Sequence, residues 1–215
     1  MSIAAKICGL STEAAVATAV AEGVAFVGFV FYAPSPRAVS AEKAAELCTG
    51  VPRTVARVGL FVDADDDAIS DVLAAAPIDI LQFHGNESPA RVADAKARFA
   101  RPVMKVVPIA RLEDLAASTR YEDVADMLLF DAKPPRRPDA LPGGNGLAFD
   151  WELIAGRSWR RPWMLSGGLS AELLPQAVRI SGATMVDVSS GVESRPGVKD
   201  LGKIRAFMAA ARALG

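Results

Sequence analysis

Short apolar runs alternate along this chain with alanine-rich segments that have the composition of helices. Residues 25–31 form a continuous apolar run, as expected for a strand that is buried on both faces of a parallel sheet. Residues 12–21 are rich in alanine and are followed by Gly23, which is typical of a helix and its end. Repeated along the chain, this alternation predicts strands that end at Cys8 and cover residues 25–31, 55–62, 78–83, 103–107, 127–130, 163–165 and 185–188, and helices over residues 12–21, 41–49, 65–76, 89–99, 112–119, 149–156, 170–179 and 200–214.

This order of elements predicts an α/β fold, a closed (β/α)8 TIM barrel of eight parallel strands. We expect residues 1–215 to form a single domain, because no linker interrupts the pattern and the length suits a small barrel. One long loop, residues 132–148, follows the sixth strand and contains four prolines and then Gly143-Gly144-Asn145-Gly146. Loops of this length within a compact domain are usually functional or disordered.

The composition argues against several classes of protein. The formal net charge of −1 argues against nucleic acid or a membrane surface as a partner. No apolar run is long enough to cross a bilayer and no signal peptide is recognisable, so we expect a cytoplasmic protein. Two cysteines, Cys8 and Cys48, are too few for a disulfide framework, and the single histidine, His84, cannot build a multi-histidine metal centre. Without a long apolar surface stripe, we expect a monomer.

Two glycine-rich turns follow the last two predicted strands. Ser166-Gly167-Gly168 comes directly after the seventh strand, and Ser189-Ser190-Gly191 comes directly after the eighth. Barrels of this kind often bind a phosphate with the backbone N–H groups of these two loops, and glycine lets the backbone approach the ligand. Either turn alone is explained equally well as a tight turn, but their positions together favour a phosphate site.

Cys8 and Asp131 end the first and sixth predicted strands, at the barrel face where the loops converge. A thiolate and a carboxylic acid on opposite sides of a pocket form a base and an acid. Strand alternation directs Lys6 to the same face as Cys8, where its ammonium should lower the thiol pKa and favour the thiolate. The alternatives are structural: cysteine is often a small buried apolar residue, and aspartate often caps its own loop. Cys48 lacks such a context, and we interpret it as a packing residue.

Several motifs in order, from Lys6 to about Phe207, resemble the phosphoribosylanthranilate isomerase family, whose members are barrels of tryptophan biosynthesis. The matching stretches are Lys6–Leu10, Val27–Phe29, Ser35–Arg37, Arg57–Val62, Gln82–Glu87, Leu129–Lys133, Gly143–Gly146, Phe149–Trp151, Ser166–Leu169, Val186–Ser194 and Pro196–Asp200. Most of them lie at the C-terminal ends of predicted strands.

This resemblance implies a reaction and a set of roles. N-(5-phosphoribosyl)anthranilate would be converted by an Amadori rearrangement to 1-(2-carboxyphenylamino)-1-deoxyribulose 5-phosphate, without a cofactor. Cys8 matches the family's general base, Asp131 its general acid, and Arg37 the arginine that pairs with the anthranilate carboxylate. A planar guanidinium suits such a bidentate partner. The other residues that we expect around the substrate are Lys6, Gln82, His84, Gly144, Gly146, Ser166, Gly167, Gly168, Asp187, Ser189, Ser190 and Gly191.

Other readings compete with this one. A metal-dependent sugar-phosphate epimerase needs several histidine and acidic ligands, and one histidine does not supply them. Indole-glycerol-phosphate synthase needs a catalytic lysine and glutamate at other strand ends, and a cysteine hydrolase needs a base beside the thiol. Two alternatives stay open: a non-catalytic sugar-phosphate-binding barrel, and another aldose–ketose isomerase of the same fold.

Overall fold

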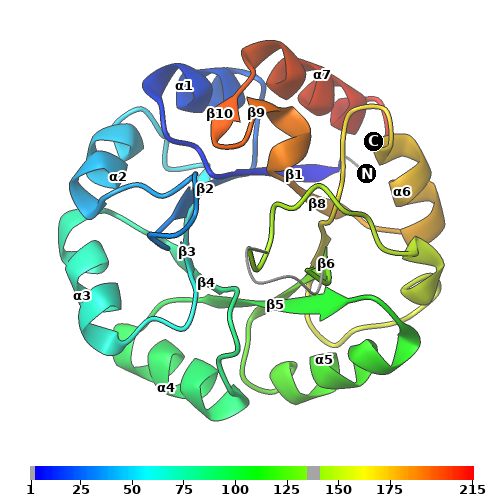
Figure 1. Ribbon diagram of the computed structural model, residues 1–215, viewed down its shortest axis with the longest axis horizontal. Coiled ribbons are helices and arrows are strands. Elements are labelled where there is room, and N and C mark those ends of the chain that lie inside the picture. Colours follow the sequence, from blue (N-terminus) through cyan, green and yellow to red (C-terminus); the bar gives the residue numbers. More distant parts are fainter. Residues whose placement is uncertain (1–2, 135–140) are drawn as a thin grey trace.

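The computed structural model describes residues 3–134 and 141–215, which close into a barrel of eight parallel strands surrounded by helices (Figure 1). Neighbours in the sheet follow the order of the chain, and the last strand of the barrel pairs with the first. The strands are β1 (Ala4–Cys8), β2 (Phe26–Val30), β3 (Ala56–Phe61), β4 (Ile80–Phe83), β5 (Val103–Ile109), β6 (Met127–Ala132), β7 (Trp163–Leu165) and β8 (Met185–Val188). The predicted (β/α)8 fold is confirmed.

The helices form the outer ring in Figure 1. They are α1 (Glu13–Ala21), α2 (Ala41–Cys48), α3 (Asp66–Ala75), α4 (Pro89–Phe99), α5 (Ala116–Tyr121), α6 (Leu174–Ser181) and α7 (Leu201–Arg212), with short 3-10 turns η1 (Leu112–Leu115), η2 (Trp151–Leu153) and η3 (Ser190–Val192). Ser40 and Ser88 cap α2 and α4: each accepts a hydrogen bond from the third residue of its helix, and Pro89 opens α4. No helix in the described part of the chain is long and apolar enough to cross a membrane.

Two predicted helices are wrong in extent. The segment 149–156 forms only the turn η2, which begins after Asp150 and is followed by Gly156 in the left-handed region at φ +65°. The helix predicted over 170–179 is α6, which begins at Leu174; Ser170 instead closes the preceding turn by accepting a bond from Leu173 N at 3.3 Å. Pro175 explains the later start, because proline is favoured in the first turn of a helix.

Two further features differ from the sequence pattern. A small antiparallel hairpin, β9 (Glu193–Arg195) with β10 (Val198–Lys199), follows η3 and was not predicted. Strand β6 extends to Ala132, one residue beyond its predicted end at Asp131, so the long loop begins later. Residues 135–140 of that loop, including Pro135 and Pro138, lie outside the described residues.

The register of the strands determines which side chains meet inside the barrel. Pairing of β1 with β8 sets Lys6 opposite Asp187, and pairing of β1 with β2 sets Cys8 opposite Gly28. A buried apolar cluster fills one part of the barrel and contains Met104, Val106, Leu129 and Met164. A separate cluster of Cys8, Val30 and Leu60 lies at the ends of β1, β2 and β3. The polar side chains of the site therefore rest on a packed interior.

Candidate active site

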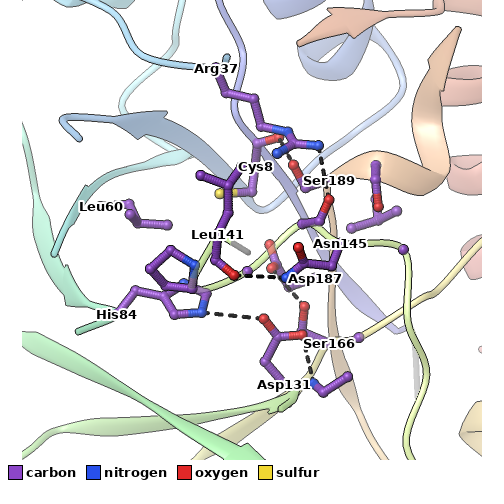
Figure 2. Close-up of a pocket in the computed structure, with 18 of the residues that line it drawn as sticks. Cys8, Arg37, Leu60, His84, Asp131, Leu141, Asn145, Ser166, Asp187 and Ser189 are labelled. Atoms are coloured by element: carbon purple, nitrogen blue, oxygen red, sulfur yellow. Dashed lines mark hydrogen bonds and ion pairs between the residues drawn. The ribbon is translucent and has the colours of Figure 1, made fainter. Parts of the chain in front are cut away.

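A pocket opens at the C-terminal ends of the strands, where the barrel loops converge (Figure 2). Its walls contain every residue that the sequence predicted around the substrate except Lys6, which is fully buried. Apolar side chains that were not predicted complete the wall: Val30, Tyr32, Leu60, Val62, Leu141, Pro142 and Leu147. A flat aromatic ligand would find contact area there, since apolar walls with a few polar groups are typical of ligand pockets.

The thiol of Cys8 lies next to a buried ion pair between Lys6 and Asp187. Lys6 Nζ donates to Asp187 Oδ1 at 2.9 Å, and Ser166 Oγ donates to Asp187 Oδ2 at 3.0 Å. Lys6 is 0% exposed, and burial by itself would lower its pKa, but the attraction of Asp187 raises that pKa overall. Lys6 is therefore a permanent cation in this protein.

Burial raises the pKa of the Cys8 thiol above its ordinary value. The ammonium of Lys6 opposes this effect, as predicted, while the Asp187 carboxylate adds to it. The effect of Lys6 is thus the expected one, but the pKa of the thiol is raised overall, because the cost of moving a thiolate out of water is larger than the gain from one cation. Lys6 therefore reduces the rise in the pKa of the Cys8 thiol but does not cancel it.

Asp131 lies at the end of β6, beside His84 (Figure 2). One carboxylate oxygen, Oδ1, accepts a hydrogen bond from the N–H of Ala132 at 2.8 Å. The other oxygen, Oδ2, lies 3.3 Å from His84 Nε2, within reach of an ion pair, although the two atoms are not aligned for a hydrogen bond. Among the described residues no donor is hydrogen-bonded to Oδ2. Gly143 covers the pair, because a Cβ there would collide with the His84 ring.

Gln82 reaches the same pocket from β4 and is 1% exposed. Its Oε1 has no hydrogen-bond partner in the described part of the chain. A buried acceptor without a partner is uncommon in native proteins and is often completed by a ligand. Gln82 therefore fits the predicted place beside a polar substrate.

The two glycine-rich turns both line the pocket, on the side of β7 and β8. Gly167 and Gly168 have φ values of +86° and +62°, which glycine adopts without strain. A Cβ at Gly168 would lie 2.7 Å from the N atom of Ala148, so the strand-six loop packs directly against this turn. Within the described residues the amides of Gly168 and Gly191 have no backbone acceptor. Such amides form a site for an anion.

Arg37 lines the pocket on the side of β2 and is 5% exposed. Its Nε and Nη2 donate to the two carboxylate oxygens of Glu193 at 2.8 and 2.9 Å, and Nη2 also donates to the carbonyl of Gly144 at 3.2 Å. Glu193 is thus a partner that the sequence analysis did not single out, although it lies in one of the matching stretches. Cys48 lies in the core at the end of α2, away from the pocket lining, as its packing role predicts.

Among the described residues no group of three or more histidine, cysteine, aspartate or glutamate side chains is arranged to hold a metal ion. The pocket is lined by a carboxyl group, a thiol and two glycine-rich turns. A closed parallel barrel with these groups at its C-terminal mouth defines an enzyme class, the (β/α)8 acid–base enzymes that act on phosphorylated small molecules.

Comparison with known proteins narrows this class. Residues 5–210 match the family model of N-(5'-phosphoribosyl)anthranilate (PRA) isomerase, so the chain belongs to that family. It is 56% identical over 214 residues to the N-(5'-phosphoribosyl)anthranilate isomerase of Paracoccus denitrificans, with 99% of each chain covered. The corresponding protein of Rhodospirillum centenum is 54% identical over 214 residues, with 100% of each covered.

Solved structures agree with the sequence relatives. The phosphoribosyl anthranilate isomerase of Thermotoga maritima superposes with a TM-score of 0.87 at 34% identity, over 99% of this chain and 100% of the other. Another structure of such an isomerase, in complex with reduced 1-(o-carboxyphenylamino)-1-deoxyribulose 5-phosphate, gives a TM-score of 0.83 at 32% identity, over 99% and 100%. The family, the barrel fold and the tryptophan-biosynthesis isomerase function that the sequence implied are confirmed.

Proposed function

We propose that this chain performs the isomerisation of N-(5-phosphoribosyl)anthranilate with Cys8 as general base and Asp131 as general acid. One observation carries the assignment of these roles. A thiol from β1 and a carboxyl group from β6 line the same pocket. The two glycine-rich turns and the guanidinium of Arg37 line it as well. The described pocket offers this reaction a base, an acid and a partner for each anionic group of the substrate.

The chemistry explains why an acid and a base are both needed. Asp131 protonates the ring oxygen of the ribose while the anthranilate nitrogen donates its lone pair, so the furanose opens to an iminium ion. The iminium acidifies the hydrogen at C2′, and the Cys8 thiolate removes it to give an enolamine. The enolamine then tautomerises to the ketone product. The electron pair stays within the substrate, so no redox partner is required.

The protonation states follow from the surroundings of the two groups. Burial raises the pKa of the Cys8 thiol, so the reactive thiolate is a minority species at neutral pH. The Lys6 ammonium next to it supplies the positive charge that stabilises the thiolate when it forms. A buried cation held in place by Asp187 does not have to reorganise during the reaction, which is how preorganised electrostatics lower a barrier.

Substrate binding is assigned by the charges of the ligand. The phosphate is held by the amides of Gly168 and Gly191, and the anthranilate carboxylate pairs with Arg37. The ring is covered by apolar side chains such as Leu60 and Val62, and the ribose hydroxyls meet Gln82. Monomeric state and cytoplasmic location stay predictions of the sequence.

The test is a fluorescence assay in which anthranilate, phosphoribosyl pyrophosphate and the preceding transferase generate the unstable substrate in place. Sustained loss of substrate fluorescence requires a catalyst, whereas a non-catalytic binding barrel would not sustain it. Cys8→Ala and Asp131→Asn should each lower kcat by about a hundred- to ten-thousand-fold, since acid–base groups typically contribute that much. Both variants should still bind the product, because the anchors for its two anionic groups are intact.

Cys48→Ala is the matched control for the thiol, because Cys48 is buried in the core at the end of α2. It should keep its turnover. Near-wild-type turnover in Cys8→Ala would refute the role of this thiol as general base. It would support the alternative that Cys8 is a packing residue. A wild-type enzyme that converts a different phosphorylated aldose faster would favour another aldose–ketose isomerase.

A further inference from the structure

The hairpin β9–β10 lies directly after the turn of β8, inside the ring of helices in Figure 1. It carries two charged side chains, Glu193 and Lys199, that are nearly inaccessible to water, at 3% and 2% side-chain exposure. The reaction scheme above does not use either of them. Burying a charged pair is costly unless its partners are placed well.

Glu193 is saturated with donors. Its two oxygens accept from Arg37 Nε and Nη2, and Oε1 also accepts from Lys199 Nζ at 2.8 Å. Although burial alone would raise the pKa of Glu193, the bonds from Arg37 and Lys199 hold that pKa below its usual range. Glu193 is therefore an anion that fixes one edge of the Arg37 fork. The remaining nitrogen, Nη1, lies next to Gly144 and makes no hydrogen bond among the described residues.

Lys199 connects the same carboxylate to the other side of the pocket. Its ammonium donates to the carbonyl oxygen of Ser189 at 2.9 Å and lies 3.2 Å from Ser189 Oγ. Ser189 Oγ in turn donates to the carbonyl oxygen of Cys8 at 3.1 Å. A continuous set of polar contacts thus runs from Arg37 through Glu193 and Lys199 to the turn after β8.

The backbone of the hairpin is held just as closely. Gly197 has a φ of +81°, and a Cβ there would collide with the carbonyl oxygen of Pro36, next to Arg37. Lys203 of α7 donates to the backbone carbonyl of Glu193 at 2.7 Å. The loop that carries Arg37 and the turn of β8 are therefore both braced against one short hairpin.

We propose that Glu193 and Lys199 are positioning residues that tie Arg37 to the phosphate-side turn at Ser189, so that the pocket selects ligands whose carboxylate and phosphate are a set distance apart. Two cations and one carboxylate leave the cluster with one positive charge, which a single ligand carboxylate neutralises. The bidentate bond to Glu193 removes the freedom of the guanidinium before the ligand arrives, and such preorganisation improves binding. This inference rests on the proposed role of Arg37 as the carboxylate anchor.

The test compares two ligands on one set of variants by titration calorimetry. The first is reduced 1-(o-carboxyphenylamino)-1-deoxyribulose 5-phosphate, and the second is the same compound without the carboxylate. Glu193→Asp keeps the charge but shortens the side chain, so the Arg37 fork moves or loses one of its two bonds. Because a misplacement of about 1 Å at a binding group costs up to about a hundredfold, the Kd of the first ligand should rise at least about tenfold. The Kd of the second ligand should change by less than about twofold.

Two lysine variants change different contacts of Glu193, and the second is the control for the first. Lys199→Met removes a donor to the Glu193 carboxylate and should reproduce the carboxylate-selective loss. Lys203→Met removes a donor to the Glu193 backbone carbonyl only, and should leave the ratio of the two Kd values unchanged. Retained binding of the second ligand, with a cooperative thermal transition, shows that each variant is folded.

Equal weakening of both ligands by Glu193→Asp, or no weakening of either, would overturn the positioning role. Arg37→Lys separates this outcome from a failure of the proposed function. If Arg37→Lys weakens only the ligand with a carboxylate while Glu193→Asp does not, then the anchor holds and the hairpin inference is wrong. If Arg37→Lys weakens both ligands equally, the assignment of the carboxylate anchor itself fails.

Discussion

Gly28 in β2 lies beside both the thiol of Cys8 and the ammonium of Lys6, and replacing it with alanine should lower turnover. A Cβ at position 28 would lie 3.0 Å from Cys8 Sγ and 3.1 Å from Lys6 Nζ. Non-bonded heavy atoms prefer separations of about 3.5–4.0 Å. Each group must therefore move by about 0.5 Å, which disturbs the contact between the base and the cation that stabilises it.

The size of the effect follows from that displacement. A misplacement of about 1 Å in a catalytic geometry costs about a hundredfold in rate, so half of it should cost about tenfold in kcat. Overpacking of this kind typically costs about 1–3 kcal/mol of stability. The assay is the same fluorescence measurement, with the fraction of folded enzyme determined by circular dichroism.

Gly59→Ala is the control for crowding alone. A Cβ at Gly59 would lie 3.1 Å from Ile78 Cγ2 and from Phe61 Cε2, which are buried apolar contacts away from the pocket. It should lose as much stability as Gly28→Ala and keep its turnover within about a factor of two. If the two variants had the same turnover per folded molecule, the reasoning about Cys8 and Lys6 would be refuted.

Three further predictions concern the phosphate turn, the acid–base pair and the core. Gly168→Val should raise KM strongly with less effect on kcat, because φ is +62° and the new Cβ would meet the Ala148 N atom; an unchanged KM would place the phosphate elsewhere. The acid limb of kcat/KM should lie at higher pH in Lys6→Met than in wild type, because Lys6 lowers the pKa of the buried Cys8 thiol; an unmoved limb contradicts this. Burial raises the pKa of Cys48 from 9.0 to about 11, so the unfolded chain loses this proton first and the free energy of unfolding should fall between those pH values. In urea titrations Cys48→Ala should lack this fall, of at most about 2–3 kcal/mol, and an identical pH profile would count against it.

The barrel itself was predictable because its signals are local. A strand that is buried on both faces is a continuous apolar run, and each helix begins at a recognisable cap such as Ser40 or Ser88. The positions of Cys8 and Asp131 at the ends of β1 and β6 followed from counting strands. The segment 149–156 was mistaken for a helix, because whether a short segment continues past one turn depends on its packing rather than on its composition.

The chemistry was predictable only as far as residue type and strand position determine it. The alternation of strands showed that Lys6 and Cys8 share a face, and the two glycine turns predicted a phosphate site on the side of β7 and β8. The partners of these groups were not readable, since a contact such as Glu193 with Arg37 joins residues 156 positions apart. No local pattern distinguishes an acidic side chain in a hairpin that holds an arginine from one that faces water.

Amino-acid order alone therefore determined that this chain forms an α/β barrel and which side chains stand at its mouth. Tertiary structure decided how those side chains are charged and aimed. Lys6 meets Asp187 across 181 residues only because β8 closes on β1, and the same closure buries Cys8 and raises the pKa of its thiol. The physical reason is that desolvation and ion pairing depend on everything packed around a group, whereas the tendency to form a strand or helix depends mainly on neighbours in the chain.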